Sequence, residues 1–280
     1  MIGWKEICIL RKFQPYSTWL YQKLFLKCKI HCRQFTESSS QLYKDRVVLL
    51  HGFLGFRYQL LPLATILKRK GFSVSNFGYP SRDDFIINHA RNLIDVLNSL
   101  SSRETRTFHF VTHSLGAIIL RTALAQPNCP ETAKSGRLVL LAPPLKGSKF
   151  ARYLQSRDLG GKLPKWMETT SKWIVGDCTG RQLMIMSVQE FDDMPYFPSS
   201  TSILVIAAEM GRLNPLLEGR NDGVLEVEET MLGQPHYRLL VRGTHNSLLF
   251  QPKVIECILN FLCEKKVSTD IIYVQNKRLL

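Results

Sequence analysis

Apolar residues recur along the chain with two different spacings. Short runs rich in β-branched and aromatic residues predict strands, and longer stretches with apolar residues three and four positions apart predict helices. In chain order these are strand 46–50, helix 58–70, strand 72–77, helix 84–100, strand 107–111, helix 115–126, strand 137–141, strand 203–208, strand 237–241 and helix 254–262. Because strands mostly alternate with helices, the sequence predicts an α/β fold, with a mainly parallel sheet and helices on both faces.

The alternation lapses between about residues 145 and 200, where glycine, proline, tryptophan and methionine are frequent. We predict a cap or lid inserted after strand 137–141. Residues at helical spacing predict a short helix within it, with one face made of Leu163, Trp166, Met167, Thr170, Trp173 and Ile174. This face either packs onto the domain or lines a cleft for an apolar ligand, and the pattern is compatible with both.

A serine lies where a predicted strand meets a predicted helix, within residues 112–116. A strand, a sharp turn and a helix in this order expose the hydroxyl of Ser114 and direct the N–H of Leu115 to the same point. Close packing there requires small residues two positions before and after the serine. Gly116 meets this requirement, whereas Thr112 is bulkier than the glycine usual at its position. Taken alone, the run is equally compatible with a serine that caps a helix.

A second loop follows the strand 46–50 and begins with a His-Gly pair. The tetrahedral intermediate of acyl transfer needs two N–H donors, one from the residue after the nucleophile and one from a loop after an earlier strand. Gly52 lets this loop approach closely. We therefore assign the oxyanion donors to the backbone N–H groups of Phe53 and Leu115, although a His-Gly pair is also common in tight turns.

An acid and a base follow two late strands. Asp222 lies in an Asn-Asp-Gly turn after strand 203–208, and His245 follows strand 237–241. A histidine can remove the proton from Ser114 near neutral pH, and a carboxylate fixes the imidazole tautomer. Each residue alone has a structural interpretation, but their order and their places after strands predict a catalytic triad.

The other histidines fit this role less well. His113 adjoins the serine and is expected to point away from it, and His89 is expected on a surface helix. Asp192 and Asp193 fall in the cap, away from the strand ends. Four residues are predicted to border the substrate cleft: Leu54, His113, Trp166 and Trp173.

These motifs, at 51–53, 112–116, 221–223 and His245, resemble the signatures of lipase- and esterase-type α/β-hydrolases, and the similarity covers about residues 46–264. The Asn-Asp-Gly turn resembles bacterial lipases in particular. The resemblance implies a capped α/β-hydrolase fold and an acyl-enzyme mechanism. Some related lipases bind calcium through an aspartate near the catalytic histidine, but Asn246 and Ser247 follow His245, so a calcium site is not expected.

The composition adds an excess of positive charge. The chain has 280 residues and 37 Lys plus Arg against 23 Asp plus Glu, a formal net charge of +14. Its first 33 residues hold one acidic residue among basic and aromatic ones, which suits either a packed arm or the interface of an anionic membrane. We predict an arm at 1–41, a hydrolase domain at 42–266 and a tail at 267–280. A targeting segment at the start remains an alternative.

Seven scattered cysteines favour a reducing compartment over a disulfide framework. Cys28, His31 and Cys32 lack a second ligand pair at zinc spacing, and no phosphate-binding or dinucleotide motif is present, so we predict no metal and no cofactor. No recognised nucleic-acid-binding module occurs, and we expect no nucleic-acid partner. The absence of a signal-like apolar run predicts a cytoplasmic protein, with peripheral membrane contact left open.

Together these features predict a serine hydrolase of carboxylic esters, with lipid or acyl esters as substrates. The same triad would serve a thioesterase, an amidase or a peptidase. A non-catalytic binding protein with this fold is a further alternative, which the retention of all three triad residues argues against. Acyl length, head group and oligomeric state do not follow from the sequence.

Overall fold

The computed structural model describes residues 45–101, 106–155, 178–263 and 271–274. The chain divides into two units, Met1–Ser40 and Gln41–Leu280, and all described residues belong to the second. The predicted arm therefore lies outside the described residues, and its membrane contact remains a prediction. No helix in the described part is long and apolar enough to cross a membrane.

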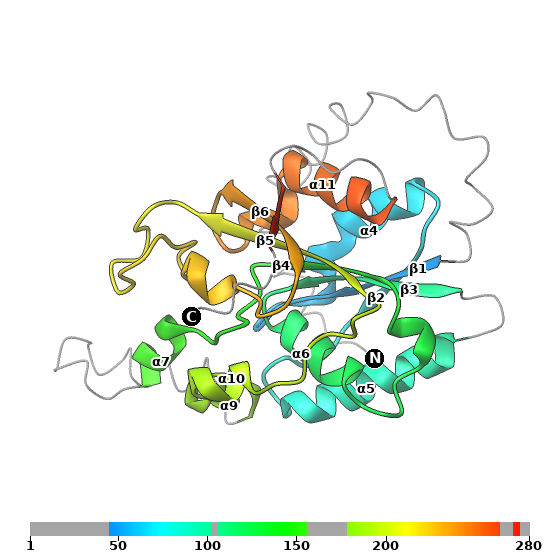
Figure 1. Cartoon of the computed structure of the whole chain (residues 1–280), viewed down its shortest axis with the longest axis horizontal. Coiled ribbons are helices and arrows are strands. Elements are labelled where there is room, and N and C mark those ends of the chain that lie inside the picture. Colours follow the sequence, from blue (N-terminus) through cyan, green and yellow to red (C-terminus); the bar gives the residue numbers. More distant parts are fainter. Residues whose placement is uncertain (1–44, 102–105, 156–177, 264–270, 275–280) are drawn as a thin grey trace, which may run out of the picture. The chain divides into compact units, whose positions relative to one another are not determined.

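A seven-stranded sheet forms the centre of the described structure, in the order β2-β1-β3-β4-β5-β6-β7 (Figure 1). All neighbouring strands are parallel except the last pair, β6 and β7. The strands are β1 Asp45–Leu50, β2 Ser73–Phe77, β3 Thr107–His113, β4 Arg137–Leu141, β5 Ser202–Glu209, β6 His236–Arg242 and β7 Ile272–Val274. The predicted α/β class and the mainly parallel sheet are confirmed.

Helices cover both faces of this sheet, with α4 and α11 on one side and α5 and α6 on the other (Figure 1). The central strands are therefore buried on both faces, which is why β4 and β5 are almost continuously apolar rather than alternating. The main helices are α4 Leu61–Arg69, α5 Ile86–Leu100, α6 Leu115–Leu124 and α11 Pro252–Leu262. Short 3-10 helices cover Arg57–Leu60, Glu131–Ala133, Val227–Thr230 and Ser247–Phe250.

In the described part of the segment between β4 and β5, where the sequence predicts an insertion, the structure has three short helices. They are α7 Lys149–Gln155, α9 Thr179–Ile185 and α10 Val188–Asp192. The predicted helix at 163–174 lies outside the described residues, and with it Trp166 and Trp173. Their assignment to the substrate cleft therefore stays a prediction.

Two expectations about the fold were wrong. Tyr237–Val241 does not form the last strand, because β7 pairs antiparallel with β6 at the edge of the sheet. His89 is not on a surface but is fully buried, since it lies on the same helical face as Ala90, Leu93 and Leu97.

Candidate active site

Ser114 occupies a strained turn between the end of β3 and the start of α6. Its backbone has φ 52° and ψ −122°, a region that non-glycine residues rarely adopt. Its N–H donates to the carbonyl of Leu141 at 2.9 Å, which ties the turn to β4. A Cβ atom on Gly116 would lie 2.9 Å from the carbonyl oxygens of Leu50 and His51. Only glycine therefore allows α6 to start this close to β1.

Thr112, which departs from the usual glycine, is accommodated by complete burial in β3. Its hydroxyl has no hydrogen-bond partner among the described residues. The bulkier side chain is thus compatible with the turn, at the expense of one unsatisfied buried hydroxyl.

The loop after β1 passes directly beside the serine. A Cβ atom on Gly52 would lie 3.0 Å from the Cβ of Ser114. His51 lies below this loop with Nδ1 2.9 Å from the Gly52 carbonyl, and its ring stacks on Tyr79 at 4.2 Å. The Tyr79 hydroxyl donates to the His51 carbonyl at 2.6 Å. Burial lowers the pKa of His51, which favours the neutral ring that this arrangement requires.

Neither of the two predicted oxyanion donors has another hydrogen-bond partner among the described residues. The N–H of Phe53 makes no hydrogen bond within the described residues. Leu115 is the first residue of α6, where backbone N–H groups have no partner inside the helix. Both groups therefore retain the capacity to bind an oxyanion.

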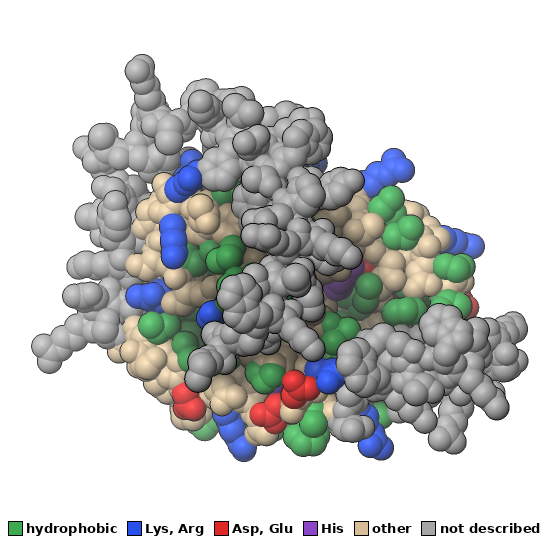
Figure 2. Space-filling view, turned by 180° about the vertical axis from the view of Figure 1, so that it is seen from behind, with side chains coloured by type: hydrophobic (Ala, Val, Ile, Leu, Met, Phe, Trp, Pro, Cys, Tyr) green, Lys and Arg blue, Asp and Glu red, His purple; other side chains and the backbone are tan. Residues whose placement is uncertain are grey.

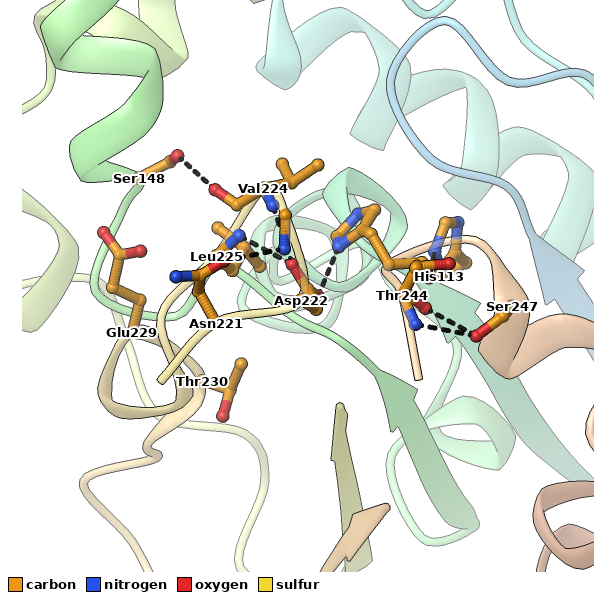
Figure 3. A network of polar contacts seen from close by, with 12 residues as sticks. His113, Ser148, Asn221, Asp222, Val224, Leu225, Glu229, Thr230, Thr244 and Ser247 are labelled. Atoms are coloured by element: carbon orange, nitrogen blue, oxygen red, sulfur yellow. Dashed lines mark hydrogen bonds and ion pairs between the residues drawn. The ribbon is translucent and has the colours of Figure 1, made fainter. Parts of the chain in front are cut away.

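Asp222 and His245 lie together at the ends of β5 and β6. His245 Nδ1 is 2.8 Å from Asp222 Oδ2, and both side chains are almost fully buried. The other carboxylate oxygen, Oδ1, accepts the N–H groups of Val224 and Leu225 at 2.9 and 2.8 Å (Figure 3). The N–H of His245 also donates to the Asp222 carbonyl at 2.9 Å. The carboxylate is thereby held in one orientation toward the imidazole.

Asn221 holds the turn that carries Asp222, a role that the sequence analysis did not assign. Its fully buried side chain accepts the N–H groups of Asn214 and Gly223 at 2.9 and 3.1 Å and donates to the Gly219 carbonyl at 3.0 Å. The Asn-Asp-Gly pattern was the available signal, because such turns use side-chain bonds to neighbouring backbone.

A cavity of about 380 Å³ lies where these elements meet, and Ser114 and His245 both line it. No hydrogen bond joins the Ser114 hydroxyl to the His245 ring within the described part of the chain. Such contacts are often long before substrate binds. Leu54 and His113 also line the cavity, and their assignment to a substrate cleft stays a prediction.

Most of the cavity wall is apolar, and much of it comes from the segment between β4 and β5. The apolar lining residues are Phe53, Leu54, Pro144, Phe150, Ala151, Leu183, Phe191, Val224 and Leu225. No lysine, arginine, aspartate or glutamate among the described residues lines it. On the face opposite to the view of Figure 1, histidine atoms are visible among hydrophobic side chains (Figure 2).

The His113 side chain contacts His245. Its Nε2 lies 3.1 Å from the His245 carbonyl, and the two ring centroids are 4.8 Å apart. Burial, with a smaller contribution from nearby His245, lowers the pKa of His113 to about 3. The neutral ring therefore donates from Nε2 and supports the His245 loop.

Arg121 was also missed. It is buried on α6 and donates to the carbonyls of Phe191, Met194 and Pro195 at 3.3, 2.9 and 2.9 Å. It thus fastens the residues after α10 to the helix that follows Ser114. The signal in the sequence was a single charged residue in a mostly apolar helix.

Within the described residues, no group of three or more His, Cys, Asp or Glu side chains could hold a metal ion. The arrangement around Ser114, Asp222 and His245 is suited to acyl transfer by a serine, a histidine and a carboxylate.

The comparisons with known proteins agree with the fold. Residues 47–255 match the model of the alpha/beta hydrolase family, and the chain belongs to that family. The lipase BlEst2 of Bacillus licheniformis, in its propeptide form, is similar in structure with a TM-score of 0.64 and 17% identity. That match covers 85% of this chain and 53% of the lipase, so the chain spans about half the length of that relative.

Two further solved structures are similar in fold at low sequence identity. The metagenomic carboxyl esterase MGS0156 has a TM-score of 0.56 at 17% identity, covering 79% of this chain and 76% of the esterase. The product of the gene lin2722 of Listeria innocua has a TM-score of 0.54 at 18% identity, covering 81% and 96%. A search of curated proteins finds no match. At these identities the likeness concerns the fold.

Proposed function

We propose that this alpha/beta hydrolase is a serine hydrolase that cleaves carboxylic esters through an acyl-enzyme. The observation that carries the proposal is the 2.8 Å contact between His245 and Asp222 at a cavity that Ser114 also lines from a strained turn. The lipase and esterase activities named for two of the similar structures point the same way.

In this mechanism Ser114 Oγ attacks the ester carbonyl while His245 Nε2 takes its proton. Asp222 Oδ2 accepts the Nδ1–H bond and stabilises the imidazolium. The N–H groups of Phe53 and Leu115 bind the oxyanion. His245 then protonates the departing alcohol, which leaves an acyl group on Ser114. A water molecule, deprotonated by His245, releases the acid and restores the free enzyme.

The cavity supports an uncharged, apolar acyl group as the part of the substrate that binds there. Burial of apolar surface supplies the affinity, about 0.8 kcal/mol for each methylene group removed from water. An ionised group in the cavity would find no opposite charge among the described lining residues.

The test is hydrolysis of p-nitrophenyl esters of increasing acyl length by the wild-type protein and by Ser114→Ala. We expect turnover by the wild type and a loss of at least about 10³-fold in the variant, whose fold is retained. Equal rates in both proteins would contradict the proposal. Turnover of thioesters or amides but not esters would keep the mechanism and change the substrate.

A further inference from the structure

Glu229 is a buried carboxylate behind the wall of the cavity. Only 4% of its surface is exposed, and it does not line the cavity itself. One carboxylate oxygen accepts the N–H of Lys149, the first residue of α7. The other accepts the N–H of Glu226 at 2.8 Å. The Glu229 carbonyl also accepts the N–H of Lys146 at 3.1 Å. One residue thus binds two segments that are far apart in the sequence.

Both of these segments continue into the cavity wall. On one side Ser148, Phe150 and Ala151 line the cavity, and on the other side Val224 and Leu225 do so. A direct bond links the two sides, because the Ser148 hydroxyl donates to the Val224 carbonyl at 3.3 Å (Figure 3). Glu229 therefore fixes the distance between two walls of the same cavity from behind.

The two bonds of Glu229 require an ionised carboxylate. Both partners are backbone N–H donors, so two acceptors are needed on one side chain. A carboxylate offers acceptors only, whereas a glutamine or a protonated glutamate turns a donor toward one of the N–H groups. Glu226 and Glu229 form a capping box, and the ionised carboxylate of Glu229 adds to it a hydrogen bond from the N–H at the start of α7.

Other charged groups surround this carboxylate. Lys149 Nζ pairs with Glu226 Oε2 at 2.6 Å, and Arg152 on α7 lies near enough to favour the charged form of Glu229. Glu218 lies near Lys149, and Arg238 on β6 donates to the neighbouring Val227 carbonyl. Burial nevertheless raises the pKa of Glu229, and the adjacent Glu226 adds to this.

We propose that Glu229 is a positioning residue that sets the width of the acyl cleft, by holding the start of α7 against the turn at Val224 and Leu225. The inference rests on the proposed ester hydrolysis and adds to it a residue that governs acyl length. Asp222 is not bonded to Glu229, and its bonds to Val224, Leu225 and His245 keep that turn in place, so the wall expected to shift when Glu229 is changed is the one at the start of α7. The chemistry at Ser114 should therefore persist when Glu229 is changed.

The variant Glu229→Gln tests this directly. It has the same shape but faces one of the two N–H groups with a donor. We expect KM for an octanoyl ester to rise on the order of tenfold, while kcat/KM for the acetyl ester changes less than about twofold, because the short group does not reach the displaced wall. A merely structural role would lower kcat/KM for both esters by a similar factor.

Glu190→Gln is the matched control. Glu190 has the same place in the capping box of α10, where Ser187 N–H donates to it at 2.7 Å, but its side chain is exposed and does not itself line the cavity. We expect its kcat/KM values to equal those of the wild type for both esters. A change of octanoyl KM in this variant equal to that in Glu229→Gln would overturn the inference.

The ratio of octanoyl to acetyl kcat/KM gives a second measurement, in which any pH effect common to both esters cancels. In the wild type this ratio should fall as the pH is lowered from neutral toward the ordinary pKa of a glutamate, because burial raises the pKa of Glu229 and the carboxylate gains its proton early; in Glu229→Gln the ratio should be low and constant. If the variant fails to fold, a wild-type ratio that stays constant over this range overturns the inference. An absence of all ester turnover by the wild type would instead contradict the proposed function.

Discussion

The two halves of the candidate site are held by different kinds of structure. Ser114 lies between a buried strand and a buried helix, and its position depends on backbone bonds and on close packing at Gly116. Asp222 and His245 lie on loops, and side chains such as Asn221 and His113 hold those loops in place. The serine half should thus respond to changes of volume, and the acid–base half to the loss of single hydrogen bonds.

The largest effect should follow a change to the loop half. In Asp222→Asn one oxygen can still accept backbone N–H groups, but the amide nitrogen faces His245 Nδ1 and imposes the wrong tautomer. We expect kcat for ester hydrolysis to fall about 10⁴-fold with an unchanged circular dichroism spectrum. The exposed Asp192→Asn is the control. An Asp222→Asn enzyme with near wild-type kcat would identify another residue as the acid.

The next effect concerns the support of His245 and appears as a dependence of stability on pH. The folded protein protonates His113 only near pH 3, whereas the unfolded chain does so near 6.5. Below pH 6.5 the unfolded state therefore binds more protons, and the free energy of unfolding falls as the pH falls. From pH 6.5 to 5 this one residue should remove on the order of 2 kcal/mol. Urea titrations at both pH values should show that His113→Gln loses less free energy of unfolding than the wild type. An identical loss in the two proteins would refute the lowered pKa of His113.

A smaller effect distinguishes a core residue that lines the cavity from one that does not. Phe191 and Phe197 are both buried in the same hydrophobic cluster, but only Phe191 lines the cavity. Phe191→Leu should deepen the cavity and raise the preference for long over short acyl esters about fivefold. Phe197→Leu should lower stability to a similar degree and leave that preference unchanged. Equal shifts in the two variants would show that the preference follows stability rather than cavity shape.

The smallest effect is a gain in stability on the serine side. The φ of 52° at Ser114 is costly for any residue with a Cβ atom, and glycine adopts it freely. Ser114→Gly should therefore raise the free energy of unfolding by about 1 kcal/mol while it abolishes turnover. Comparison of the melting temperatures of Ser114→Gly and Ser114→Ala measures this gain, since alanine retains the backbone strain. A lower melting temperature for the glycine variant would mean that the turn is not strained.

The sequence predicted the elements whose signals are local. The run from β3 through Ser114 to α6 combines a strand pattern, a small residue and a helix pattern within about twenty residues, and the structure has these elements there. The helical spacing also indicated that His89 is buried, because it lies three residues from Ile86 and four from Leu93 on the same face. The error there came from weighing the polarity of one residue above its position.

Other features depend on contacts that no local pattern records. Glu229 meets Lys149 from 80 positions away, and Arg121 meets Pro195 from 74 positions away. Their burial follows from the folded path of the chain between β4 and β5, which the irregular sequence of that segment does not specify. Strand β7 has three residues, too few for a periodic signal.

That strand has a consequence for how the protein is made. Residue Arg242 at the end of β6 is synthesised about thirty residues before Ile272, so one side of β6 has no partner in the meantime. At ribosomal rates this interval is on the order of seconds. An open strand edge can pair with another nascent chain. Late pairing of β7 covers positions 236–238 of that edge, and a chaperone that shields β6 would act during this interval.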